Sequence, residues 1–148
     1  MYGSRQVGTF NQGWVAWFCQ KAVEAKLGTL TEPFTISGTG KQVRDVLHAD
    51  DMKRLYTAAL ANIGRARGKA FNVGGGIANS LSLIELFAML ETMLGVKLKF
   101  VRTKVRESDQ RVFVADIKLA TELLGWQPTV PARQGVSDML AWVTDRNG

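Results

Sequence analysis

An arginine in a short extended run is the side chain whose type and setting most clearly suggest chemistry. Arg44 lies within residues 41–48, just after a Gly-Thr-Gly turn at 38–40. Its guanidinium is a planar fork of donors that suits a phosphate or a diphosphate. The adjacent Asp45 either orients this fork toward a ligand or neutralises it in a structural salt bridge, and residue types alone favour the salt bridge.

A second polar run, residues 106–111, offers related chemistry. At the rim of a ligand site, Arg106 would contact phosphate and Asp109 would accept hydrogen bonds from ribose hydroxyls. A run of this kind is more often a charged, solvated loop, and residue types favour that second interpretation.

Three consecutive glycines, residues 74–76, follow a strand-like run and precede a helical one. This is the position of a dinucleotide-binding loop, but the G-x-G-x-x-G spacing is absent, and so is a phosphate loop of the G-x-x-x-x-G-K-[ST] type. The glycines predict a tight turn at the end of a strand. The alternative is a turn that lets the backbone approach a ligand.

No catalytic centre and no metal site are predicted. The single His48 has no serine or cysteine partner in a known motif, and the acids at 50 and 51 fit a helix cap. One cysteine, Cys19, can form no internal disulfide, and with one histidine the chain lacks the ligands of a structural zinc site. Core packing is the expected role of the four tryptophans, Trp14, Trp17, Trp126 and Trp142.

The elements that must position these side chains alternate between helices and short strands. Apolar periodicity, caps and glycine stops predict helices over 13–27, 52–63, 82–94, 116–124 and 132–144. Short strands are expected at 34–37, 42–48, 70–73 and 97–103, the first two forming a small hairpin. The predicted class is α/β, but a complete doubly wound sheet needs more strands than these. The chain therefore resembles an α/β fragment or an accessory lobe.

Length, composition and charge set the wider limits. The 148 residues fit one ordinary globular domain, with 46% apolar and 22% charged residues. Neither a signal peptide nor an apolar run of the roughly 20 residues that span a membrane is visible, so a soluble cytoplasmic protein is the expectation. The net charge of +6 indicates either an anionic partner or a basic solvated surface. The basic residues are spread along the chain, which argues against a nucleic-acid-binding arm.

Several of these segments occur together, in this order, in a known family. Residues 1–6 (MYGSRQ), 41–51 (KQVRDVLHADD), 70–75 (AFNVGG), 106–116 and 124–128 (LGWQP) resemble motifs of the extended short-chain dehydrogenase/reductase family, which contains NAD-dependent sugar-nucleotide epimerases and dehydratases. The resemblance covers essentially the whole chain. Residues 11–22, 34–48 and 105–117 are most similar to a subfamily, the CDP-paratose 2-epimerases or CDP-tyvelose epimerases.

The resemblance implies an α/β, Rossmann-type protein of which residues 1–148 are the C-terminal, nucleotide-sugar-binding portion. It assigns the nucleotide diphosphate to Arg44, and phosphate and ribose to Arg106 and Asp109. It also assigns phosphate binding to the start of the first helix, where Asn11, Gln12 and Gly13 lie and backbone N–H groups are free. Tyr2 would lie near the nicotinamide pocket. The implied ligand is a nucleotide sugar, most closely a CDP-sugar.

The resemblance also implies chemistry that this sequence lacks. Family members use NAD to oxidise and then re-reduce a sugar carbon, with a tyrosine and a lysine spaced Y-x-x-x-K. Here Tyr2 is followed at that spacing by Gln6, and Tyr56 by Leu60. The glycine-rich NAD loop is missing too, so we expect the N-terminal NAD-binding region to be absent and the chain alone to be inactive and unable to bind NAD.

Three interpretations stay open at this point. The first is the binding portion of an epimerase, with a missing N-terminal half as its partner or with self-association through the surface that faced it. The second is a stand-alone nucleotide-sugar-binding or regulatory module. The third is a nucleic-acid-binding domain, which only the net charge suggests.

Overall fold

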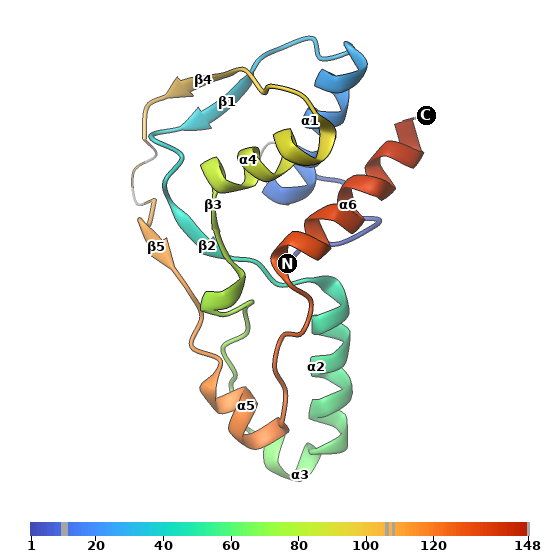
Figure 1. Ribbon diagram of the computed structural model, residues 1–148. Helices are drawn as coiled ribbons and strands as arrows, with labels where there is room; N and C mark the ends of the chain where they lie inside the picture. Colours follow the sequence, from blue (N-terminus) through green and yellow to red (C-terminus); the bar gives the residue numbers. More distant parts are fainter. Residues whose placement is uncertain (10–11, 106, 108, 148) are drawn as a thin grey trace.

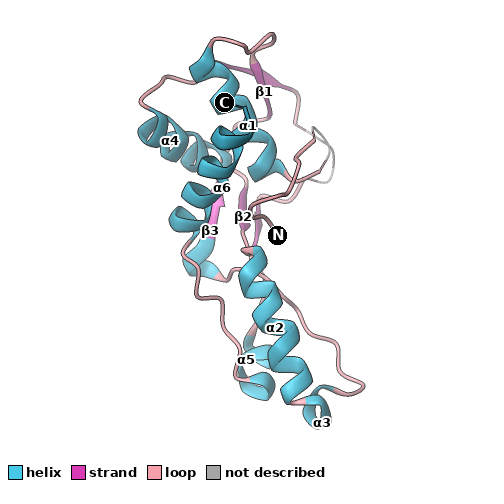
Figure 2. Ribbon diagram, turned by 90° about the vertical axis from the view of Figure 1, so that its right-hand side faces the viewer, coloured by secondary structure: helices cyan, strands magenta, loops and turns pink. Residues whose placement is uncertain are grey.

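The computed structural model describes residues 1–9, 12–105, 107 and 109–147, and its class is α/β as predicted. The molecule is elongated, with helices α1, α4 and α6 toward one end and α2, α3 and α5 toward the other (Figures 1 and 2). In chain order the elements are α1 (Trp14–Leu27), β1 (Phe34–Ser37), β2 (Val43–Asp45), α2 (Ala49–Ala61), α3 (Ile63–Ala66), η1 (Ile77–Asn79), β3 (Ser80–Ser82), α4 (Leu83–Leu94), β4 (Phe100–Thr103), β5 (Val112–Phe113), α5 (Lys118–Leu124) and α6 (Ala132–Asn147).

The strands form two small sheets that lie in the middle and at one end of the molecule (Figure 1). In the first, β1 runs parallel to β4, with Phe34 opposite Phe100. In the second, β2 is the central strand, antiparallel to β3 and parallel to β5. The helices thus position two short sheets rather than one continuous one.

The predicted hairpin between residues 34–37 and 42–48 is wrong, because β1 and β2 belong to different sheets. The turn between them contains Gly38 and Gly40, both with positive φ. The carbonyl of Gly40 accepts a hydrogen bond from Ile84 N at 3.1 Å, and the Ile84 side chain lies against the same glycine. This contact with the start of α4 directs the chain away from β1 instead of folding it back.

The larger core fills the space between α1, α4, α6 and the first sheet. Four phenylalanines form a continuous aromatic contact there, with ring centroids 5.0 to 6.0 Å apart: Phe18, Phe34, Phe87 and Phe100. The helix α4 begins with the capping box expected from sequence, in which Ser82 Oγ accepts from Glu85 N and Glu85 Oε2 accepts from Ser82 N. A buried face and a satisfied N-terminus hold this helix in place.

A smaller core joins α2 to α5 and to the chain that precedes α6. Its buried members are Leu47, Leu55, Ala120, Leu124 and Trp126. The cap of α2 differs from expectation, since neither Asp50 nor Asp51 caps it. His48 is the N-cap residue, and its Nδ1 accepts from Asp50 N at 3.3 Å.

The predicted strand at residues 70–73 is not a strand in the structure and belongs to neither sheet. The other strands and the helices confirm the alternation expected from sequence. Within the described residues, no helix is long and apolar enough to cross a membrane.

Candidate functional site

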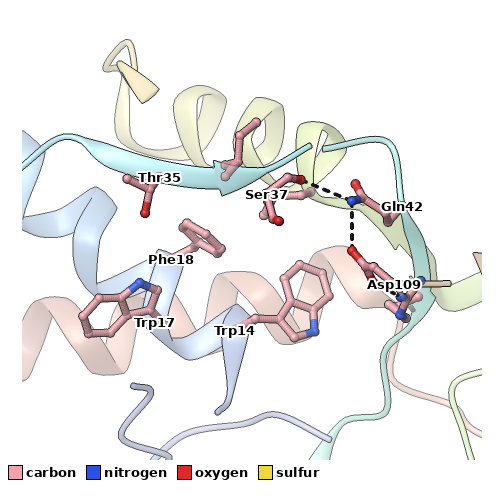
Figure 3. Close-up of a pocket in the computed structure, with 10 residues that line it drawn as sticks. Trp14, Trp17, Phe18, Thr35, Ser37, Gln42 and Asp109 are labelled. Carbon is pink, nitrogen blue, oxygen red and sulfur yellow. Dashed lines mark hydrogen bonds and ion pairs between the residues drawn. The ribbon is translucent and has the colours of Figure 1, made fainter. Parts of the chain in front are cut away.

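A pocket of about 260 Å³ opens between α1 and the chain that links β1 to β2 (Figure 3). In Figure 3, aromatic side chains of α1 form one wall, and β1 lies opposite them. Ser37, Gln42 and Asp109 gather at one end, whereas Thr35 lies toward the other. The lining residues are Trp14, Trp17, Phe18, Thr35, Ile36, Ser37, Gln42, Arg44, Leu83 and Asp109.

The polar end of the pocket is a hydrogen-bonded group of three side chains. Arg44 Nη2 donates to Asp109 Oδ1 at 2.7 Å, and Gln42 Nε2 donates to Asp109 Oδ2 at 3.0 Å. Gln42 Nε2 also donates to the carbonyl of Ser37 at 3.2 Å. The Arg44 and Asp109 side chains retain 28% and 24% of their exposure, so the ion pair is sheltered but reachable from the pocket.

The second sheet brings Arg44 and Asp109 together. Arg44 is the middle residue of β2, opposite Leu81 of β3 and Phe113 of β5. Since β5 is parallel to β2 with Val112 opposite Val43, the chain entering β5 runs beside the residues that precede Val43. Asp109 lies on that approach, where the Arg44 side chain reaches it. The two sequence runs predicted separately as anion sites therefore meet in one pocket.

Asp45 does not pair with Arg44, so the salt bridge that residue types favoured is wrong. Successive side chains of a strand point to opposite faces. Asp45 Oδ2 instead accepts hydrogen bonds from Gly76 N and Ala115 N, each at 3.2 Å. The Arg44 guanidinium therefore pairs with Asp109 and lines the pocket.

The three glycines at 74–76 serve the packing of this same region. A Cβ on Gly74 would lie 2.0 Å from Asp45 Oδ2, and one on Gly75 would lie 2.0 Å from the carbonyl oxygen of Val46. Gly76 has a φ of 70°. The turn is tight because it packs directly against β2. This agrees with the prediction of a tight turn rather than with a turn that lets the backbone approach a ligand.

Two of the tryptophans are more than core residues. Trp14 and Trp17 lie on α1, half-buried, and line the pocket next to the buried Phe18. Lys21 Nζ lies 4.8 Å from the centroid of the Trp17 ring. The sequence did not predict this role, nor the polar lining residues Thr35, Ser37 and Gln42. The available signal was a set of aromatic residues at i, i+3 and i+4, namely Trp14, Trp17 and Phe18, directly after the glycine that begins the helix.

The structure describes two of the three residues predicted to bind phosphate at the start of α1, and this role stays a prediction for all three. Gly13 is the N-cap residue with a φ of 72°, and no side chain caps this helix. Gln12 exchanges two backbone hydrogen bonds with Thr9, at 2.8 and 3.2 Å. Asn11 and Arg106 lie outside the described residues, so their assignments stay predictions.

Tyr2 is buried in the core rather than exposed at a pocket. It is 2% exposed, its hydroxyl donates to the carbonyl of Ala132 at 3.2 Å, and its ring meets His48 edge-on. Burial, the main cause, raises the pKa of the Tyr2 hydroxyl above its usual range. The expected place of Tyr2 beside a nicotinamide stays a prediction. Among the described residues, no group of three or more His, Cys, Asp or Glu side chains is arranged to hold a metal ion.

Comparison with known proteins gives consistent matches. The model of a protein family described as "Epimerase: NAD dependent epimerase/dehydratase family" matches residues 1–74. The CDP-paratose 2-epimerase of Salmonella typhi is 60% identical over 144 residues, which are 97% of this chain and 42% of that protein. The UDP-glucuronate 4-epimerase of Thermodesulfobacterium geofontis is 32% identical over 75% of this chain and 33% of its own length.

Solved structures of similar proteins show the same fold. The UDP-glucose 4-epimerase of Thermotoga maritima, solved with UDP-glucose, has a TM-score of 0.80 at 27% identity, and the match covers 99% of this chain and 44% of that one. The UDP-glucuronic acid 4-epimerase of Bacillus cereus, solved with UDP-glucuronic acid and NAD, also gives 0.80 at 27% identity, covering 98% and 43%. The chain thus spans less than half the length of these relatives.

Proposed function

Because this chain belongs to the NAD-dependent epimerase/dehydratase family, we propose that its pocket binds the nucleotide part of a nucleotide sugar. The supporting observation is the pairing of an aromatic wall with a charged end in one pocket. Aromatic faces stack on bases, and an arginine fork binds phosphate. The volume of about 260 Å³ lies below the roughly 300–1,000 Å³ of drug-sized sites. It therefore suits part of a nucleotide sugar rather than the whole.

The proposal gives each polar side chain a role. Arg44 uses one of its nitrogens on Asp109 and another on the carbonyl of Val43, at 2.8 Å. A guanidinium has five N–H donors, so donors remain for an anionic oxygen. The Asp109 carboxylate accepts two hydrogen bonds in the pocket, from Arg44 and Gln42. A carboxylate can accept about four, so it can also accept one from a ribose hydroxyl. Gln42 holds this carboxylate in place.

We propose a CDP-sugar as the ligand. The 60% identity to a CDP-paratose 2-epimerase supports cytosine as the base, whereas the solved neighbours at 27% identity carry UDP-sugars. The base would lie against Trp14 and Trp17, and the diphosphate would extend toward Arg44.

We further propose that these 148 residues do not catalyse epimerisation by themselves. They contain no Y-x-x-x-K pair, and the one carboxylate among the described residues that line the pocket, Asp109, is held by Arg44 and Gln42 and is assigned here to the ribose. They do not fit NAD either: the glycines at 74–76 are packed against β2 rather than open to a pyrophosphate. The residues that carry out hydride transfer in this family would therefore have to be supplied by other polypeptide.

Titration of the chain with CDP tests this function. We expect saturable quenching of tryptophan fluorescence and a rise in Tm, because a ligand at 100 times its Kd adds about 2.7 kcal/mol to the free energy of unfolding. UDP should bind more weakly than CDP, and cytidine without phosphates should bind more weakly still. An unchanged Tm and unchanged fluorescence at millimolar CDP would refute the proposal.

A further inference from the structure

A lysine lies over one of the aromatic side chains that line the pocket. Lys21 follows Trp17 by about one turn of α1, and its Nζ is 4.8 Å from the centroid of the Trp17 ring. At this i, i+4 spacing the two side chains share one face of the helix, and the later one leans back toward the helix N-terminus. The ammonium is therefore within the range of a cation–π interaction with the indole.

Two further side chains of α1 hold this ammonium in place. Lys21 Nζ donates to Glu24 Oε2 at 2.6 Å, and Gln20 Nε2 donates to Glu24 Oε1 at 3.0 Å, so both oxygens of the carboxylate are engaged. Burial by itself would raise the pKa of Glu24, but the hydrogen bonds from Lys21 and Gln20 lower it below its usual value. Glu24 is thus the anionic partner that anchors the ammonium.

The Lys21 side chain is more sheltered than that of a typical surface lysine. It keeps 24% of its exposure and the Glu24 side chain 20%, whereas Lys26 on the same helix is exposed. A lysine held in this way loses side-chain freedom. An i, i+3 ion pair near a helix surface adds little to stability in return. The larger effect of the arrangement is therefore on the Trp17 ring, which the ammonium restrains.

We infer that Lys21 is a positioning residue for the pocket, one that fixes the orientation of the Trp17 ring on which the base of the ligand stacks. An indole has two faces, and the face that the ammonium covers is closed to a ligand. In Figure 3, Trp17 lies toward the Thr35 end of the pocket, away from Asp109 and its partner Arg44. With the phosphates at Arg44, the restrained ring lies at the end left for the base. The inference rests on the proposed function for the ligand, but the restraint on the ring does not.

NMR spectroscopy of the chain without ligand tests the restraint. A ring current shields protons that lie over an aromatic face, so the ε-methylene protons of Lys21 should resonate upfield of those of Lys26, and this difference should disappear in Trp17→Leu. In Lys21→Met the order parameter of the Trp17 side-chain N–H should fall. Lys21→Arg keeps a cation that stacks on the ring and should preserve it. Lys26→Met makes the same change of charge on the same helix and is the matched control.

Titration with CDP tests the consequence for binding. Lys21→Met should raise the Kd about two- to fivefold, the range expected for a partly exposed cation–π contact, and should change the Tm by less than about 2 °C. Lys21→Arg should recover most of the affinity, and Lys26→Met should leave the Kd unchanged. In a Trp17→Leu background, Lys21→Met should have no further effect, because a residue that acts only through another has no effect once that other residue is removed.

Three results would overturn the inference: Lys21 protons that resonate like those of Lys26, equal Kd values for Lys21→Met and Lys26→Met, or the same loss of affinity from Lys21→Met with and without Trp17. The last result would mean that the charge of Lys21 acts on the nucleotide directly. If the unchanged chain does not bind CDP, the proposed function is refuted, and the spectra without ligand then decide by themselves whether Lys21 positions the ring.

Discussion

Arg44 and Asp109, 65 residues apart in sequence, form a 2.7 Å ion pair at the charged end of the pocket. Gln42 fixes the other carboxylate oxygen of Asp109. The fork of Arg44 is therefore held in one orientation before a ligand arrives. Such preorganisation reduces the entropy lost on binding, so each member of the group should contribute to affinity.

Removing the fork of Arg44 should weaken nucleotide binding in two steps. Arg44→Lys keeps the charge but loses the planar fork, and we expect CDP affinity to fall about tenfold. Arg44→Ala removes charge-assisted hydrogen bonds worth about 1.5–3 kcal/mol, so the loss should be roughly tenfold to 150-fold. Isothermal titration calorimetry measures both. Arg67→Ala, at the exposed end of α3, is the control and should bind CDP normally; equal affinity of Arg44→Ala and Arg67→Ala would remove Arg44 from the site.

The aromatic wall should contribute through stacking. Stacking of a base on an aromatic side chain is worth about 1–3 kcal/mol. Trp14→Leu and Trp17→Leu keep an apolar side chain but lose the stacking face, so at least one of them should raise the Kd for CDP about fivefold or more. Trp142→Leu on α6, outside the pocket, is the matched control. If all three variants bind CDP alike, the base does not lie on this wall.

A buried carboxylate should dominate the stability of the other end of the molecule. Asp51 is fully buried, accepts from Thr129 N at 2.7 Å and Val130 N at 3.1 Å, and pairs with Arg54. Asp51→Ala leaves these donors without an acceptor, so we expect a loss of about 3 kcal/mol in the free energy of unfolding. Urea denaturation measures it. Asp138→Ala, exposed on α6, should change stability by less than about 0.5 kcal/mol.

The helices could be predicted from sequence because their signals are local. Gly28, Gly95 and Gly125 end α1, α4 and α5 in the left-handed conformation, as glycines after helices commonly do. The pairing of β1 with β4 was not predictable in this way. It joins Phe34 to Phe100 across the sequence, and only the packing of α1 and α4 on the aromatic core selects it over the hairpin.

The site was predictable in its parts but not in its assembly. Residue types identify Arg44 and Asp109 as ligand-binding candidates one by one, but their contact depends on the parallel register of β2 and β5. They give Asp45 the wrong partner, because neighbouring strand residues point to opposite faces. They also place Trp14 and Trp17 in the core, since periodicity identifies an apolar face without indicating whether another element covers all of it.

Acid should destabilise the protein through Glu85. Its pKa is lowered, chiefly by the hydrogen bond with the Ser82 side chain and then by that with the Ser82 backbone. A carboxyl with a lowered folded-state pKa adds stability above its unfolded pKa of about 4.3, and this stability is lost as the pH falls through the lower folded pKa. Glu85→Gln should therefore flatten the fall in Tm between about pH 5 and pH 3. The control is Glu122→Gln, because the Glu122 carboxylate lies 3.7 Å from Lys118 Nζ on the exposed side of α5. An equal flattening in both variants would contradict the role of the capping box.

Two glycine substitutions should separate close packing from helix propensity. A Cβ on Gly135 of α6 would lie 2.2 Å from the Tyr2 hydroxyl and 3.0 Å from His48 Cδ2, so Gly135→Ala must displace the N-terminal residues from the core. We expect a loss of about 1–3 kcal/mol in the free energy of unfolding. A Cβ on Gly64 of α3 would meet no described atom within 4 Å beyond its own helix and chain neighbours, and this glycine has no positive φ, so Gly64→Ala should instead stabilise by about 0.4–1 kcal/mol. Urea denaturation of both variants gives the two signs directly, and a stable Gly135→Ala would show that Tyr2 is not packed on α6 in solution.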